Sequence, residues 1–356
     1  MTIKELFKEA VKQKASDLHL VVGLPPILRI DGELFEIKGK KVITRREMEQ
    51  LVFSILQPRH KENFLRDKEL DVSYEMEEGW RFRVNVFYEK DNLGLVARVI
   101  NEKIPTLEEL DMPDAIFRLL ELKQGLILVT GPTGCGKSTS LAAMINFINN
   151  NRRCHIITFE DPIEYVFVPN KSIIIQRQLG SDMNTFADGL KHAMRQDPDV
   201  IMVGEMRDLE TIATTITLAE TGHLVLATLH TYNAAQTIDR IIDIFPPHQQ
   251  NQVRMQISMT LAGVLSQRLL PKEGGGRIAA REIMINTTAV SNLIRENKIP
   301  QIKTVIETSA RDGMVSLDQD IRRLYKNKLI SQKIAVNYME NPTLLGGVGG
   351  WLGKKG

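Results

Sequence analysis

A glycine-rich turn between an apolar run and a helix-forming segment is the stretch of this sequence that most directly implies chemistry. Residues 126–145 read LILVTGPTGCGKSTSLAAMI, and Gly131, Gly136, Lys137 and Ser138 fit the spacing G-x-x-x-x-G-K-[ST] of a nucleoside-triphosphate loop. Glycines lack the Cβ atoms that would keep backbone N–H groups from curling around phosphate oxygens, and they accept positive φ angles. The following helix directs the positive end of its dipole at the same anion.

Two side chains of this loop predict magnesium-dependent ATP binding. Lys137 would place its charge on the β- and γ-phosphates, and the Ser138 hydroxyl would ligate Mg²⁺. Cys135 lies at the helix N-terminus, where a reactive thiolate is one interpretation and a small filler beside backbone donors is the preferred one. The residues expected to contact the nucleotide are Gly131, Pro132, Thr133, Gly134, Cys135, Gly136, Lys137, Ser138 and Thr139.

Acidic residues end two other apolar runs. Glu205 follows VIMV, and Glu160 with Asp161 follows HIITF. Such carboxylates can reach Mg²⁺, with Glu205 the predicted ligand, or accept a proton from an attacking water. Asp161 and Asp208 could instead cap helices. The sequence leaves open whether Glu160 or Glu205 activates the water.

Around these residues, short apolar strands alternate with helical segments. Residues 126–129, 155–159, 200–203 and 224–228 are the buried strands, and this alternation predicts an α/β fold with a largely parallel sheet covered on both faces. Open sheets of this kind bind ligands at the carboxyl ends of their strands, where the candidate residues fall.

The first hundred residues predict a separate α+β domain. An amphipathic helix, a hairpin turning at Asp31-Gly32 and several short strands fill residues 1–100. In RFRVNVF, residues 81–87, alternation places Arg83 on a polar face, for which a solvated surface is the simplest interpretation. Phosphoryl transfer commonly uses an arginine from outside the nucleotide-binding core, so Arg83 and Arg98 are also candidates for that role.

The remaining boundaries follow from composition. Residues 101–114 contain two prolines and predict a linker, followed by the core at 115–270. A helical region is expected at 271–343, in which Ser316 and Gln319 form a capping box. The glycine-rich residues 344–356 predict a flexible tail.

Composition excludes several classes of protein. A formal net charge of +2 is too small to favour nucleic acid or an anionic membrane as the main partner. No apolar run approaches the roughly 20 residues that span a bilayer, and the N-terminus lacks a signal peptide's apolar centre, so a cytoplasmic protein without membrane insertion is expected. The two cysteines, Cys135 and Cys154, cannot form a disulfide framework or a four-cysteine zinc site.

Together the motifs resemble those of the PilT-like retraction ATPases of type IV pili, within the secretion-ATPase superfamily. The resemblance covers about residues 1–340 and includes TFEDPIEY at 158–165, similar to the family's Asp box, and RQDPDVIMVGEMRDLETI at 195–212, similar to its Walker B region. TGHLVLATLHT at 221–231 resembles the His box, and AVSNLIRE at 289–296 resembles a C-terminal motif of retraction ATPases. Four further segments complete the match: ASDLHL at 15–20, PPILRIDGEL at 25–34, RFRVNVF and GPTGCGKST.

This resemblance implies a RecA-like P-loop ATPase core with a smaller PAS-like N-terminal domain, assembled into a homo-hexamer. It implies that Glu160 is the catalytic carboxylate and Glu205 the Walker B acid. His223 and His230 would sense the nucleotide, although from the residues alone both histidines were expected to be structural. Arg83 and Arg98 match arginine-finger positions.

The resemblance also implies ATP-driven pilus disassembly, which powers twitching motility, through an inner-membrane platform protein at the base of the pilus machine. Assembly ATPases of the superfamily generally carry a four-cysteine zinc motif, and this chain has only two cysteines, so retraction fits better than extension. Cys135 stands where the family usually has serine, and Lys90-Asp91 falls where relatives often carry an arginine, so no third finger is assigned.

Three alternatives remain open at this point. One is an accessory retraction ATPase resembling PilU, which could equally be a partner of the motor. Another is a slowly hydrolysing scaffold that regulates another motor. The third, a DNA-translocating ATPase, is disfavoured by the near-neutral charge and by the lack of a basic, aromatic-interleaved stretch.

Overall fold

The computed structural model describes residues 1–30, 32–100 and 103–345, and the chain divides into two compact units. The N-terminal unit contains residues 1–103 with 162–166, and the C-terminal unit contains residues 104–161 and the described residues from 167 onward. Expectations for Asp31, for residues 101–102 and for the tail from 346 lie outside the described residues.

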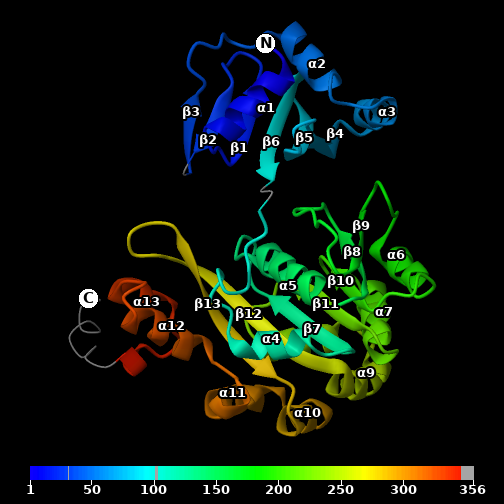
Figure 1. The fold of residues 1–356 in the computed structure, drawn as a ribbon, viewed down its shortest axis with the longest axis vertical. Coiled ribbons are helices and arrows are strands. Elements are labelled where there is room, and N and C mark those ends of the chain that lie inside the picture. The colour runs from blue at the N-terminus through cyan, green and yellow to red at the C-terminus, as the bar shows by residue number, and fades with distance from the viewer. Residues whose placement is uncertain (31, 101–102, 346–356) are drawn as a thin grey trace. The chain divides into compact units, whose positions relative to one another are not determined.

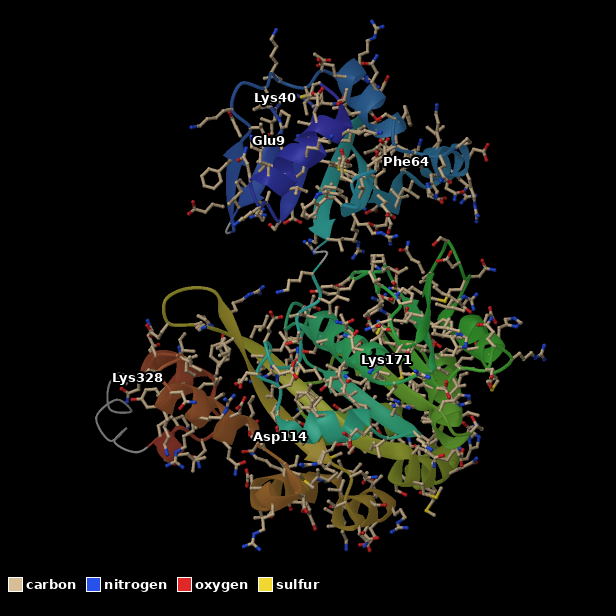
Figure 2. All side chains as sticks on the ribbon, in the orientation of Figure 1. Glu9, Lys40, Phe64, Asp114, Lys171 and Lys328 are labelled. Carbon is tan, nitrogen blue, oxygen red and sulfur yellow. The ribbon has the colours of Figure 1, made fainter. Side chains whose placement is uncertain are left out.

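The N-terminal unit is an antiparallel sheet packed against helices (Figure 1), as expected of a small α+β domain. Its six strands run in the order β3-β2-β1-β6-β5-β4. Phe82, Val84 and Val86 of β5 are fully buried, which confirms the alternation expected of RFRVNVF. Phe64, labelled in Figure 2, is buried and stacks on Tyr88. The elements are α1 (Ile3–Lys12), β1 (Asp17–Val21), β2 (Ile27–Ile30), β3 (Glu33–Glu36), α2 (Arg45–Phe53), α3 (Pro58–Asp67), β4 (Glu69–Glu75), β5 (Arg81–Glu89) and β6 (Asn92–Ile100).

The C-terminal unit is built on a seven-stranded sheet of order β13-β12-β7-β11-β10-β8-β9, in which all neighbours pair in parallel except β12 with β13. Strands β7, β10 and β11 are buried at every residue, as expected for strands covered on both faces. The strands are β7 (Gly125–Thr130), β8 (His155–Glu160), β9 (Ile173–Gln178), β10 (Val200–Val203), β11 (Leu224–Leu229), β12 (Leu261–Pro271) and β13 (Arg277–Ile285).

Helices cover both faces of this sheet, and Figure 1 shows α12 and α13 beside the β12–β13 hairpin, at the other end of the sheet from α6 and α7. Ser316 caps α12 through the expected capping box, and Asp208 caps α7. The helices are α4 (Asp114–Leu120), α5 (Lys137–Asn151), α6 (Phe186–Ala193), α7 (Leu209–Glu220), α8 (Ala234–Asp243), α9 (Pro247–Thr260), α10 (Thr288–Arg295), α11 (Ile302–Thr308), α12 (Leu317–Lys326) and α13 (Gln332–Tyr338). Among the described residues, none of the helices has the length and apolar content needed to cross a membrane.

Two expected boundaries differ from the structure. The described part of the expected linker, from Ile104 onward, belongs to the C-terminal unit, because Leu107 and Met112 are buried. The expected boundary at 270 falls inside the β12–β13 hairpin, where Pro271 pairs with Arg277. The glycines between these two residues form the hairpin loop rather than a connection between separate regions.

Arg281 of β13 holds the segment before α4 in place. Its guanidinium donates to the carbonyl oxygens of Leu110 and Asp111, at 2.6 and 3.0 Å, and its backbone N–H donates to the buried Asp320 carboxylate. Burial lowers the pKa of Arg281, and the negative charges of Asp320 and Asp111 oppose that effect. Such a buried cation is tolerated only where its partners are present.

We predict that Arg281→Met destabilises the C-terminal unit by an amount on the order of 3 kcal/mol, because two charged hydrogen bonds disappear. The lower urea midpoint of that unit would reveal the loss. Arg277→Met, an exposed position on the same strand, is the matched control. Equal midpoints for the two variants would contradict this role of Arg281.

Candidate functional site

The phosphate loop lies between β7 and α5, and its backbone allows only glycine at its first position. Gly131 has a φ of 143°. A Cβ atom there would lie 2.3 Å from the Gln267 carbonyl oxygen and 2.6 Å from the Cys135 sulfur. The loop is therefore pressed against β12 more closely than any residue with a side chain permits.

Lys137 folds back over this loop. Its ammonium donates to the carbonyl oxygens of Gly131 and Pro132, at 2.8 and 3.2 Å, and the side chain is buried. Gly136 occupies the N-cap of the 15-residue helix α5 and supplies no capping side chain. Ser138 and Thr139 lie half-buried in the first turn, whereas Thr133 and Gly134 are exposed. This cradle of backbone donors, helix dipole and ammonium fits a chain of phosphates.

Strand β12 supports the loop through two buried polar residues that sequence patterns did not identify. Gln267 donates from Nε2 to the Cys135 carbonyl oxygen at 2.8 Å, and it accepts from the Ser140 hydroxyl at 2.9 Å. Ser266 accepts from the Thr130 hydroxyl at 2.8 Å. The signal available in the sequence was the polar pair in the otherwise apolar LAGVLSQRLL, but nothing local shows that this strand lies beside β7.

Cys135 is buried between the loop and β12. Burial raises the pKa of its thiol, and the nearby Lys137 charge opposes this only in part. A thiol that is harder to ionise is a poorer nucleophile at neutral pH. The geometry thus supports the small-filler interpretation rather than the reactive one.

Glu160 ends β8 as a buried carboxylate. Its Oε1 accepts from the Thr158 hydroxyl at 2.6 Å and from the Gln176 amide at 3.0 Å. Asp161, the next residue, is exposed. Because β8 runs parallel to β10, with Phe159 opposite Val203, Glu160 ends at the same sheet edge as Glu205.

Glu205 lies among charged side chains. Its Oε1 is 2.9 Å from His230 Nε2, at the end of β11, and its Oε2 accepts from Arg207 at 2.7 Å. Burial opposes ionisation of Glu205. The Arg207 hydrogen bond and the positive charges of His230, Arg207 and Lys137 nevertheless hold its pKa below the usual range. The carboxylate therefore stays ionised throughout the neutral range.

The structure separates the two histidines of the predicted His box. His230 contacts Glu205, but His223 precedes β11, where its carbonyl accepts from the Gly125 N–H at the start of β7. Its Nδ1 lies 2.9 Å from the Leu218 carbonyl oxygen. Because β11 runs parallel to β7 for six residues, His223 lies at the opposite sheet edge from the phosphate loop, about 20 Å away. The structure thus places His223 away from the phosphate loop of its own chain, and its role in sensing the nucleotide stays a prediction.

The two candidate arginines belong to the N-terminal unit. Arg83 of β5 and Arg98 of β6 are directly opposite each other in the sheet. Arg98 donates to the buried Asp17 carboxylate at 2.9 Å, and Arg83 lies 3.7 Å from Asp71. These acids hold two neighbouring cations on one face of the sheet. Their participation in a nucleotide site remains a prediction.

Known proteins with similar sequences and structures match nearly the whole chain. The sequence model of the family described as "Type II/IV secretion system protein" matches residues 1–328. The chain is 46% identical to the "Type IV pilus retractation ATPase PilT" of Pseudomonas aeruginosa, over 94% of this chain and 97% of that protein. It is 37% identical to the "Type IV pilus ATPase PilU" of the same organism, over 96% of this chain and 89% of that protein.

A solved structure agrees with the fold. The crystal structure of the "Pilus Retraction Motor PilT and Bound ADP" superposes with a TM-score of 0.91 at 46% identity, covering 97% of this chain and 99% of that one. The expected α/β class, with an ATPase core and a smaller N-terminal domain, is thereby confirmed.

We predict that Gln267→Leu weakens nucleotide binding on the order of tenfold, because the buried Cys135 carbonyl loses its donor and the loop loosens. Isothermal titration with ADP measures the change. Gln124→Leu is the control, since Gln124 is exposed and lies at the opposite edge of the sheet. Unchanged affinity in Gln267→Leu would show that β12 does not shape the loop.

Proposed function

The chain belongs to the type II/IV secretion system protein family, and we propose that it is an ATP-hydrolysing motor that retracts type IV pili. The observation that carries this proposal is the meeting of Lys137, Glu160, Glu205 and His230 at one edge of the parallel sheet. Glu160 ends β8, and the other three residues follow β7, β10 and β11; the parallel registers bring the ends of these four strands to one edge of the sheet. Phosphoryl transfer needs a phosphate cradle and carboxylates in this relation.

Nucleotide binding rests on the loop and on α5. Backbone N–H groups of residues 134–139 would donate to oxygens of the β- and γ-phosphates, and Lys137 would exchange its carbonyl partners for phosphate oxygens. Ser138 and Glu205 would hold Mg²⁺, because a hydroxyl and an ionised carboxylate are the hard oxygen ligands that this ion prefers. When bound, Mg²⁺ neutralises charge on the phosphates.

The two carboxylates divide the remaining chemistry. Glu205 has a lowered pKa and is held by His230 and Arg207, which makes it a weak base and a good ligand. Glu160 is buried at the end of β8, and hydrogen bonds from Thr158 and Gln176 fix its carboxylate, which supports it as the residue that orients the attacking water and takes its proton. His230, in contact with Glu205, would report the state of the γ-phosphate.

The finer assignments follow from the resemblance to pilus motors. Arg83 and Arg98, supplied by the PAS-like N-terminal domain of an adjacent subunit, would stabilise the transition-state charge in a homo-hexamer. The ring would work in the cytoplasm at the inner-membrane base of the pilus machine, against the platform protein and with a PilU-like ATPase as a further partner. The higher identity to PilT than to PilU favours the principal motor over the accessory one.

We expect Glu160→Gln to lower the ATPase kcat at least a hundredfold while ADP still binds, because the water loses its base. Glu205→Gln should raise the Mg²⁺ concentration required for half-maximal activity. Steady-state phosphate release measures both, and Glu210→Gln, an exposed acid on α7, is the control. Comparable, negligible turnover in the wild type and in every variant would favour a scaffold instead.

Deleting the gene should leave cells with excess pili and no twitching, because pili would be assembled without being withdrawn. Electron microscopy of the deletion strain, complemented with the wild type or with Glu160→Gln, tests this. Bald cells would contradict retraction and point to assembly.

A further inference from the structure

Gln176 connects the buried carboxylate of Glu160 to the far end of the segment that follows it. The residue lies on β9, directly opposite Thr158 of β8 in the parallel register. Its Nε2 donates to Glu160 Oε1 at 3.0 Å, and its Oε1 accepts from the Phe167 backbone N–H at 2.9 Å. One amide group therefore touches both ends of the segment 161–166, which leaves β8 at Glu160 and is fixed again at Phe167.

The Phe167 contact determines which way the amide faces. A backbone N–H can only donate, so the side-chain oxygen of Gln176 must face Phe167 and its NH₂ group must face Glu160. Phe167 is itself anchored, because its side chain is buried. The backbone N–H of Phe167 thus orients the amide independently of the carboxylate to which the amide donates.

The consequence for Glu160 is a carboxylate held in a defined place. Thr158 and Gln176 both donate to its Oε1. Two donors from adjacent strands also fix the rotation of the group. A catalytic base held in one orientation reacts faster than a freely rotating one, because misplacement by about 1 Å can cost about a hundredfold in rate.

We propose that Gln176 is a positioning residue that orients Glu160 for water activation and couples that orientation to the conformation of residues 161–166. The inference rests on the proposed ATPase function and on Glu160 as its base. A conformation of the segment that displaced the Phe167 N–H would leave the amide without its anchor and the Glu160 carboxylate without a fixed donor. Hydrolysis then depends on the placement of a segment that need not touch the nucleotide.

Two substitutions test the proposal through different readouts. Gln176→Leu removes both hydrogen bonds and should lower kcat at least tenfold, with the KM for ATP changing less than twofold. Gln176→Glu places a second carboxylate beside Glu160. Because like charges raise the pKa of the pair, the acidic limb of the kcat profile should move to higher pH. Ile175→Thr, whose exposed side chain points to the other side of β9, is the control for both variants.

A double-mutant cycle separates positioning from a general structural effect. Gln176 acts through Glu160, so Gln176→Leu should lower activity in the wild type and have no further effect in Glu160→Gln. ADP titration shows that each variant is folded. Three outcomes would overturn the inference: an unchanged kcat and pH profile in both Gln176 variants, a change in KM alone, or equal losses of kcat when Gln176→Leu is made in the wild type and in Glu160→Gln. Wild-type turnover in Glu160→Gln would instead overturn the function assigned to Glu160.

Discussion

The close packing of Gly131 against the backbone of β12 holds the phosphate loop in the form that the rest of the site requires, and Lys137 lies over the loop, where it donates to the carbonyl oxygens of Gly131 and Pro132. The loop can close this tightly only because Gly131 has no side chain and the β12 backbone lies against it. Gln267 then ties the loop carbonyl of Cys135 to the first turn of α5 through Ser140. Buried contacts thus preorganise the cradle, so that phosphate binding loses less conformational entropy than it would in a mobile loop.

Beside this cradle, two glutamates that both lie at the carboxyl ends of buried strands have different surroundings. Glu160 is buried and accepts hydrogen bonds from Thr158 and Gln176, whereas Glu205 lies beside positive charge that lowers its pKa. The lowered pKa of Glu205 suits a metal ligand, because a ligand must not take up a proton. In the N-terminal unit, Asp17 and Asp71 similarly allow two arginines to face each other across adjacent strands.

Local patterns were sufficient for much of the fold and for part of the site. The phosphate loop, the buried strands that follow it, the alternation of β5 and the strand-end acids were all predictable, because glycine spacing and apolar periodicity report directly on backbone geometry. For His223 these patterns favoured a structural role, and its assignment to the nucleotide came only from the family resemblance. The structure places His223 before β11, and the six paired residues of β11 and β7 separate it from the phosphate loop of its own chain.

By itself, the amino-acid sequence determined the α/β class, the nucleotide loop and the residue types available for phosphoryl transfer. Only the tertiary structure decided which of them meet. It placed β12 beside β7, so that Ser266 and Gln267 support the loop, and β9 beside β8, so that Gln176 reaches Glu160. It also buried Arg281 against the segment expected to be a linker. Strand order results from packing between segments far apart in the chain, and that packing leaves no local periodicity to read.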